Sequence, residues 1–249
     1  MRDEALAIQE RQSLSEFPQI KGIQCFCENR RAGRPGGDFF DLAAPGPDEL
    51  ACGVGTLLAK GIAGPILMTG LQTTLHSLDA RGADLPGILA ELNRIMWNIA
   101  PERTFASLFS ARIVPRTRRI YYVNAGHEAA LMVRFDGRIE RLEPHAPVLG
   151  LSRLSEYRER TVGFHPGDTL IALTEGSGAG AERLLGSGAP DRVAMRCRDL
   201  PARIVQAAES MPGAQSSDRT VLVIHYNRAG TEDIPCVPVA PRQPLAAAA

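Results

Sequence analysis

The chain has 249 residues, of which 44% are hydrophobic and 22% charged, and its 28 basic and 28 acidic residues give a formal net charge of zero. This length suits one large domain with tails or two small domains, and it is sufficient to bury a sizeable hydrophobic core. The balanced charge gives no electrostatic reason to expect binding to nucleic acid or to an anionic membrane.

The sequence contains no pattern typical of export or membrane insertion. Residues 1–5 lack a positive run followed by an apolar run, so no secretory signal is predicted. No window approaches the ~18 consecutive apolar residues that a membrane-spanning helix needs. We therefore expect a cytoplasmic protein. Cys25 and Cys27 would share one face of a strand, which is poor geometry for a mutual disulfide, so we expect buried thiols.

The first part of the chain predicts strands followed by helices. Residues 3–15 favour a short polar helix, because Leu6, Ile8 and Leu14 recur at helix-like steps among polar residues. Strands are predicted at 20–28, 39–42 and 50–54, with turn residues between the last two that indicate a hairpin. Amphipathic helices are predicted at 62–78 and from an Asp84 N-cap to about 98.

The rest of the chain returns to the period-two alternation of strands. Strands are predicted at 105–114, 119–124, 129–135, 138–142, 157–162, 169–173 and 220–226, and a short helix at 203–209. Residues 228–249 are rich in Pro and Ala without periodicity, which predicts a disordered tail. This order of elements is typical of an α+β layered domain.

Five short motifs follow one another along the chain. They are Gly36-Gly37-Asp38-Phe39-Phe40-Asp41, Val54-Gly55-Thr56-Leu57-Leu58-Ala59-Lys60-Gly61, Asn124-Ala125-Gly126-His127, Leu173-Thr174-Glu175-Gly176 and Ser217-Asp218-Arg219-Thr220. In this order they resemble the metal-dependent (PPM-type) serine/threonine protein phosphatases of the bacterial SpoIIE/RsbU-like branch. That branch typically reads GGDxxD, GDVSGKG, NAGH, TDG and DDxT.

The resemblance covers roughly residues 15–226. It implies a four-layer αββα sandwich, in which two antiparallel β-sheets pack face to face with helices outside. It also implies a linker helix at 1–15, a phosphatase domain at 16–227 and a tail at 228–249.

The chemistry that the resemblance implies depends on two hard cations, Mn²⁺ or Mg²⁺, which bridge a water and lower its pKa. That water attacks a phosphoserine or phosphothreonine directly, so no other catalytic residue is expected. Hard cations require oxygen ligands, mostly carboxylates. On this basis Asp38 and Glu175 are expected to face the metals. Asp41 is a tentative ligand, because it matches the pattern but lies three residues on and could instead cap a turn.

Three positions depart from the family pattern. At Gly55-Thr56 the family has an Asp that bridges both metals, whereas a threonine hydroxyl is neutral and a weak ligand. Ser217 replaces the first Asp of the last motif. The adjacent Asp218 would point to the opposite face in a strand but could substitute in a loop. Glu175 replaces an Asp, and flexible oxygen coordination can tolerate its extra methylene.

The remaining motif residues are expected to be architectural. They are Gly36, Gly37, Lys60, Gly61, Asn124, Gly126 and His127. A tight turn at Gly126 would let the side chains of Asn124 and His127 bond to neighbouring loops. The Gly- and Ala-rich stretch after Glu175 resembles a decayed loop more than a substrate lid.

Two functions follow from the resemblance. The first is a phosphatase acting on a phosphorylated regulatory protein such as an anti-sigma-factor antagonist, weak or inactive because of Thr56, Glu175 and Ser217. The alternative is a catalytically dead pseudophosphatase that binds such a partner in partner-switching signalling. Two Mn²⁺ or Mg²⁺ ions are expected if the site is active, and none if it is not. The N-terminal helix could connect to an upstream sensor or form a homodimer.

Overall fold

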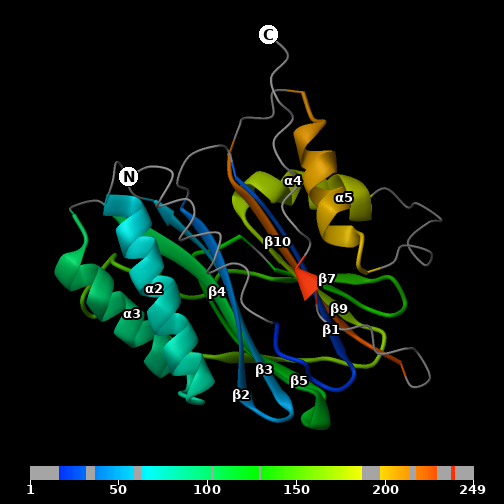
Figure 1. Cartoon of the computed structure of the whole chain (residues 1–249), viewed down its shortest axis with the longest axis horizontal. Coiled ribbons are helices and arrows are strands. Elements are labelled where there is room, and N and C mark those ends of the chain that lie inside the picture. The colour runs from blue at the N-terminus through cyan, green and yellow to red at the C-terminus, as the bar shows by residue number, and fades with distance from the viewer. Residues whose placement is uncertain are drawn as a thin grey trace.

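The computed structural model describes residues 17–31, 37–58, 63–101, 104–128, 130–186, 197–212, 217–228 and 237–238. Within these ranges the chain forms two β-sheets (Figure 1). The five-stranded sheet has the order β2 (Asp38–Gly46), β3 (Glu49–Leu58), β4 (Phe105–Val114), β5 (Arg119–Ala125) and β8 (Arg160–Gly163). The six-stranded sheet has the order β11 (Val237–Pro238), β1 (Ile23–Arg30), β10 (Arg219–Tyr226), β9 (Thr169–Leu173), β6 (Ala130–Val133) and β7 (Ile139–Leu142).

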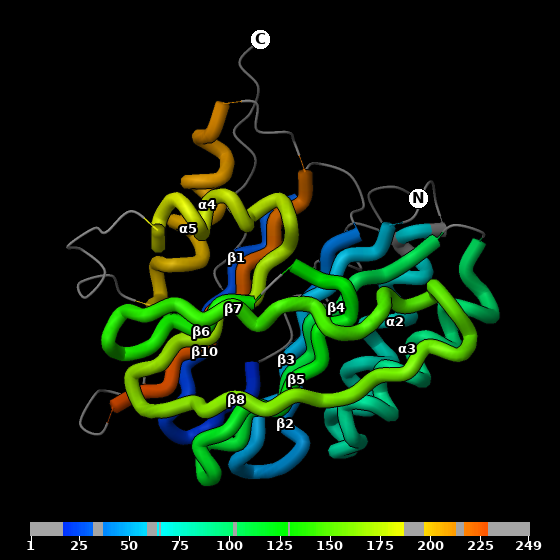
Figure 2. The backbone as a smooth tube through the Cα atoms, turned by 180° about the vertical axis from the view of Figure 1, so that it is seen from behind, coloured from blue at the N-terminus to red at the C-terminus, as the bar shows by residue number. Residues whose placement is uncertain are grey.

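Helices cover the outer face of each sheet. Buried side chains of α2 (Ala63–Ala80) and α3 (Leu85–Ile99) pack on the five-stranded sheet, and those of α4 (Glu175–Gly186) and α5 (Leu200–Glu209) pack on the six-stranded sheet. Seen from behind, the two helix pairs lie at opposite sides of the strands (Figure 2). Among the strands described here, all pairs are antiparallel apart from β1 with β11. The predicted αββα sandwich is therefore confirmed.

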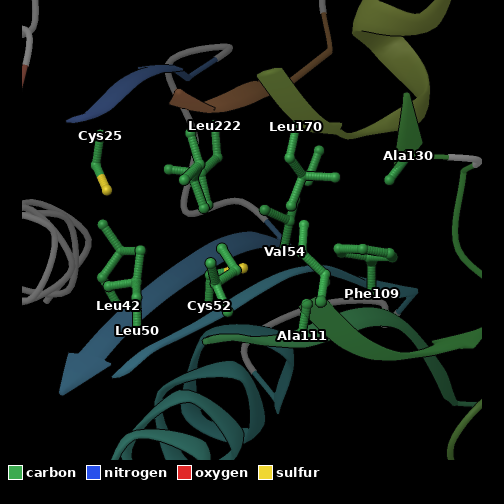
Figure 3. Close-up of a cluster of buried hydrophobic side chains, with 14 of the residues drawn as sticks. Cys25, Leu42, Leu50, Cys52, Val54, Phe109, Ala111, Ala130, Leu170 and Leu222 are labelled. Atoms are coloured by element: carbon green, nitrogen blue, oxygen red, sulfur yellow. The ribbon is translucent and has the colours of Figure 1, made fainter. Parts of the chain in front are cut away.

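The main hydrophobic core lies between the two sheets. In Figure 3, side chains of the five-stranded sheet face those of the six-stranded sheet across this layer. The alternation of each strand produces this arrangement, because every second residue points inward. Cys25 and Cys27 both belong to this core, as their spacing predicts, and both are free thiols.

Several element boundaries follow directly from local chemistry. Asp84 caps α3, and its side chain accepts a hydrogen bond from the backbone N–H of Gly87 (3.1 Å). The β2–β3 hairpin is longer than its apolar runs predict, since pairing continues from Asp38 opposite Thr56 to Gly46 opposite Glu49.

Helix α4 corrects one expectation. The stretch after Glu175, interpreted from sequence as a decayed loop, forms a helix of 12 residues. Ala181 and Leu185 pack into the core beneath α5. A Cβ at Gly180 would lie 2.3 Å from the carbonyl oxygen of Ile204, so the small residues permit close packing of α4 on α5. Tertiary packing thus overrides the low helix propensity of glycine.

The ends of the chain are described only in part. The helix predicted at 1–15 lies outside the described residues, as does most of the predicted tail. Within the tail range 228–249, Val237–Pro238 pairs with Phe26–Cys27 at the open edge of β1, where unpaired backbone groups are available. Among the helices described here, none is long and apolar enough to cross a membrane.

Candidate functional site

The sequence motifs meet where the two sheets end at the same edge of the sandwich. Asp38 is the first residue of β2 and Thr56 lies near the end of β3, in the five-stranded sheet. Thr174 follows β9 and Asp218 precedes β10, in the six-stranded sheet. Thr174 lowers the pKa of Asp38, and Asp218 raises it. The site is therefore built from both sheets.

Asp38 and Thr56 form the centre of this site. They are directly opposite each other in the β2–β3 register, so their side chains share a face. Thr56 Oγ1 donates a hydrogen bond of 2.8 Å to Asp38 Oδ1. The same row continues into β4 at Ser107, whose hydroxyl shares a 2.8 Å hydrogen bond with Nδ1 of His127. Thr56 and Ser107 thus continue a row of hydroxyl groups from Asp38 across the sheet.

Asp38 is a buried carboxyl with an elevated pKa. Burial raises the pKa of Asp38 to about 6, against the opposing effect of the hydroxyls of Thr174 and Thr56. The negative charge of Asp218 raises this pKa further, whereas the nearby Arg31 lowers it. Asp38 Oδ2 is buried with no partner at hydrogen-bond distance among the described residues. The ionisation of Asp38 therefore depends on its burial and on its hydroxyl neighbours.

The loop before β10 is held against the start of α4. Arg219 is buried, and its guanidinium donates to the carbonyl oxygens of Gly176 (2.9 Å) and Ser217 (3.3 Å). The backbone N–H of Thr220 donates to Thr174 Oγ1 (3.0 Å). These bonds hold the loop that carries Asp218, which lies just before β10 and whose charge raises the pKa of Asp38.

The two other sequence candidates of this region lie at the surface. Glu175 is an exposed residue in the first turn of α4, and Ser217 is exposed beside Gly176. The structure therefore brings Asp38, Thr56 and Asp218 together and leaves Glu175 at the rim. Gly36, Lys60 and Gly61 lie outside the described residues.

Asp41 does not join this site, which corrects the tentative assignment. It is three residues beyond Asp38 on β2, and alternation turns it to the opposite face, toward α2. There it forms an ion pair with His76, whose Nδ1 lies 3.0 Å from Asp41 Oδ1. Burial raises the pKa of Asp41, and the bond to Asp41 raises the pKa of His76.

A second buried carboxyl, Asp79, belongs to the cluster around Asp41 and His76. Asp79 is 1% exposed at the end of α2, and within the described part of the chain both its carboxylate oxygens lack hydrogen-bond partners. Burial and the charge of Asp41 raise the pKa of Asp79 to about 7, despite the opposing charges of Arg112 and His76. The guanidinium of Arg112 donates to the carbonyl of Ala83.

Contacts around the glycine and NAGH motifs support their architectural interpretation. A Cβ at Gly37 would lie 2.2 Å from the carbonyl oxygen of Leu57, so only glycine fits there. Gly126 has φ +63°, and the Asn124 side chain accepts from the N–H of His127 (2.9 Å) and donates to the carbonyl of Leu142 (3.1 Å). Burial lowers the pKa of His127 to about 4, so its ring is neutral at physiological pH.

Sequence reasoning missed several residues of this site. Thr174, Ser107 and Arg219 all contribute hydrogen bonds there, yet none was selected as a site residue. Thr174 and Arg219 lie inside two of the motifs, and this position could have indicated that they belong to the site. Ser107 becomes recognisable only from the register of β3 with β4.

The residues present do not fit the two-ion centre that the family pattern implies. Two dications need several carboxylate oxygens in one place. The site supplies Asp38 and Asp218, together with hydroxyls of Thr56 and Thr174. Across the described ranges, no three His, Cys, Asp or Glu side chains are placed to hold a metal ion together.

A comparison with protein-family models matches residues 46–227 to stage II sporulation protein E (SpoIIE). This range includes four of the five motifs and most of both sheets. The chain belongs to the SpoIIE family. The SpoIIE/RsbU-like, PPM-type phosphatase domain that the motifs indicate is thereby confirmed.

Individual relatives agree with this assignment. The chain is 27% identical over 169 residues to protein IcfG of Synechocystis, covering 56% of this chain and 26% of that protein. It is 22% identical over 163 residues to the phosphoserine phosphatase RsbU of Bacillus subtilis, covering 65% and 48%. The chain therefore spans about a quarter to a half of the length of these curated relatives.

Solved structures share the fold. The RsbU and RsbW domains of Rv1364c from Mycobacterium tuberculosis match with a TM-score of 0.71 and 20% identity, covering 86% of this chain and 62% of that chain. The SiaA PP2C domain of Pseudomonas aeruginosa matches with a TM-score of 0.65 and 21% identity, covering 90% and 95%. The phosphatase domain of Bacillus subtilis SpoIIE, with a fragment of its regulatory domain, gives 0.69 and 13%, covering 82% and 64%.

Proposed function

We propose that this SpoIIE-family domain recognises a phosphorylated serine or threonine on a regulatory protein and hydrolyses it weakly or not at all. The regulatory protein is of the anti-sigma-factor-antagonist kind, and the domain works in cytoplasmic partner switching. The relative named phosphoserine phosphatase RsbU supports this substrate class. The N-terminal segment, residues 1–15, would connect the domain to an upstream sensor or to a second copy.

One observation carries the proposal of weak catalysis. Where the family pattern has a metal-bridging carboxylate, Thr56 Oγ1 donates a hydrogen bond of 2.8 Å to Asp38 Oδ1. A hydroxyl that donates a hydrogen bond to a buried carboxylate offsets part of the cost of burying that carboxylate, whereas a second carboxylate in its place would increase this cost. The pair is therefore stable without a cation, whereas a cluster of bare carboxylates would repel itself.

The test is a double reversion, Thr56→Asp with Ser217→Asp, assayed by manganese-dependent hydrolysis of p-nitrophenyl phosphate. We expect the reverted protein to hydrolyse the ester much faster than the wild type. The matched control is Thr56→Asn with Ser217→Asn, which has similar size and no added charge and should remain as slow as the wild type. A reverted protein that folds and binds manganese but stays inert would contradict this account of the site.

A second candidate, an active phosphatase with an altered ligand set, is favoured by one feature. Asp218 lies in a loop close enough to influence Asp38, as the compensating carboxylate would need to. Under this alternative the wild type would hydrolyse the ester with manganese, and Asp218→Asn would abolish that activity. Under the main proposal the wild type shows negligible activity, and a phosphorylated antagonist protein binds it without turnover.

A further inference from the structure

An open basic hollow lies at the end of the sandwich opposite the candidate site. It has a volume of about 320 Å³ and is lined by Thr117, Arg118, Arg119, Gly163 and His165. Arg119 pairs with Val114 in the β4–β5 register, whereas Thr56 pairs with Ser107 on the same β4. Seven residues of strand separate these rows, roughly 23 Å at ~3.3 Å per residue. The hollow is therefore distinct from the Asp38 site.

The hollow results from the pairing of β5 with β8. Arg119 stands directly opposite Gly163, which presents no side chain across from the arginine. The ring of His165 lies over this gap, because a Cβ at Gly163 would be 3.0 Å from His165 Nε2. The backbone N–H of His165 is held by Asp168 Oδ2 at 3.0 Å. A guanidinium and an imidazole thus lie at the same opening.

Arg118 occupies a backbone conformation that arginine disfavours. It follows the 3₁₀ turn η1 (Pro115–Thr117) with φ +54° and ψ +43°, and in the described part of the chain no other non-glycine residue has a positive φ. The left-handed conformation costs an L-residue ~1–2 kcal/mol, and glycine or asparagine would adopt it more readily. Its N–H donates to Pro115 and its carbonyl accepts from Phe164, so the backbone is fixed from both sides. Such strain is concentrated at functional positions, which suggests that the side chain has a use.

The arginines of the hollow carry their positive charge at the surface. Among the residues that the structure describes, Arg118, Arg119 and the neighbouring Arg116 form no ion pair, and all three are exposed. Asp168, the buried carboxylate that accepts from the backbone N–H of His165, already pairs with Arg134 at 2.8 Å. Because the whole chain has a net charge of zero, these guanidinium groups give this part of the surface a local excess of positive charge.

We propose that this hollow is a second ligand site, which binds a compact phosphoanion such as the diphosphate of a nucleotide. Guanidinium groups bind phosphate oxygens through two parallel hydrogen bonds, and the two adjacent arginines match a diphosphate better than a single carboxylate. The volume lies at the lower end of the ~300–1,000 Å³ typical of ligand clefts. It accommodates the phosphates and part of the group that carries them.

The test measures pyrophosphate binding to the full chain by isothermal titration calorimetry at neutral pH and low salt. We expect saturable binding of one pyrophosphate by the wild type, weakened at least tenfold in the Arg118→Gly, Arg119→Gln double variant. Arg153→Gln is the matched control, because Arg153 is also exposed and lies in the segment between β7 and β8, outside the residues that line the hollow. It should bind as the wild type does.

A folding control is available at Arg118 itself. Arg118→Gly relieves the left-handed strain, so its melting temperature should equal or exceed that of the wild type while pyrophosphate binding falls. ADP is titrated in parallel: binding as tight as or tighter than pyrophosphate identifies a nucleotide ligand, and weaker binding identifies the free anion. The proposal is overturned if pyrophosphate shows no saturable binding, if the double variant binds it equally well, or if hexa-aspartate binds more tightly than either phosphoanion.

Discussion

Replacing Asp79 by asparagine should make the protein more stable, and increasingly so as the pH rises. Asp79 is 1% exposed, its carboxylate oxygens lack partners among the described residues, and it lies at the C-terminal end of α2, where the helix dipole disfavours a negative charge. Burial therefore favours the neutral form of this carboxyl in the folded protein. Asparagine has nearly the same shape and cannot ionise.

The magnitude follows from the pKa of Asp79, which burial raises from 3.8 to about 7. Because the pKa of Asp79 is raised in the folded state, its ionisation does not affect the free energy of unfolding below about pH 4. The free energy of unfolding falls as the pH rises from about 4 to about 7, and the contribution of Asp79 is constant above that. The rise spans about three pH units at ~1.4 kcal/mol each, so the ionised group costs the folded state about 4 kcal/mol at alkaline pH. Between pH 5 and pH 8.5, the advantage of Asp79→Asn should grow by about 3 kcal/mol.

The assay is urea unfolding followed by circular dichroism at several pH values between 5 and 8.5. Asp48→Asn is the control, since it makes the same change of charge at an exposed turn and should follow the pH dependence of the wild type. If the free energies of unfolding of Asp79→Asn and the wild type differ by a constant amount over this range, the pKa of Asp79 is not raised in the folded protein and the reasoning is wrong.

Two further predictions concern the site and the helix layer. Thr56→Val removes the hydrogen bond to Asp38, so the pKa of Asp38 should rise above 6, which NMR titration of Asp38 measures. The free energy of unfolding, measured with urea, should fall by ~1–2 kcal/mol at pH 8 and by much less at pH 5. Gly180→Ala would bring a Cβ to 2.3 Å from a backbone oxygen of α5 and should lower the melting temperature by several degrees, whereas Gly70→Ala, in open space on α2, should raise stability by ~0.5–1 kcal/mol. Equal melting temperatures for the two alanine variants would refute the close packing of α4 on α5.

The layered fold was predictable because its signals are local and agree with one another. The strand at 105–114 and the helix after Asp84 have clear periodicity and punctuation, and both occur as predicted. Helix α4 was not predictable, because its glycines disfavour a helix in isolation and its stability comes from contact with α5. Only the folded structure shows that contact.

The sequence predicts which residues belong to the candidate site better than it predicts their geometry. The motif order predicts a site that includes Asp38, Thr56 and Asp218. In the structure Thr56 donates a hydrogen bond to Asp38, and the charge of Asp218 raises the pKa of Asp38. Asp41 was misplaced because the motif spans three residues, and alternation along β2 sends it to the helix side. The hydrogen bond from Thr56 depends on the register of two strands, which the sequence does not specify alone.

The central claim is that Thr56 and Ser217 leave this SpoIIE-family domain without its two-metal centre. It is tested most directly by calorimetric titration of manganese into the purified wild-type protein at near-neutral pH, with the Thr56→Asp, Ser217→Asp variant in parallel. The account predicts no binding of an ion pair by the wild type up to millimolar manganese, and binding by the variant. Micromolar binding of two manganese ions by the wild type would contradict it and would indicate an active phosphatase.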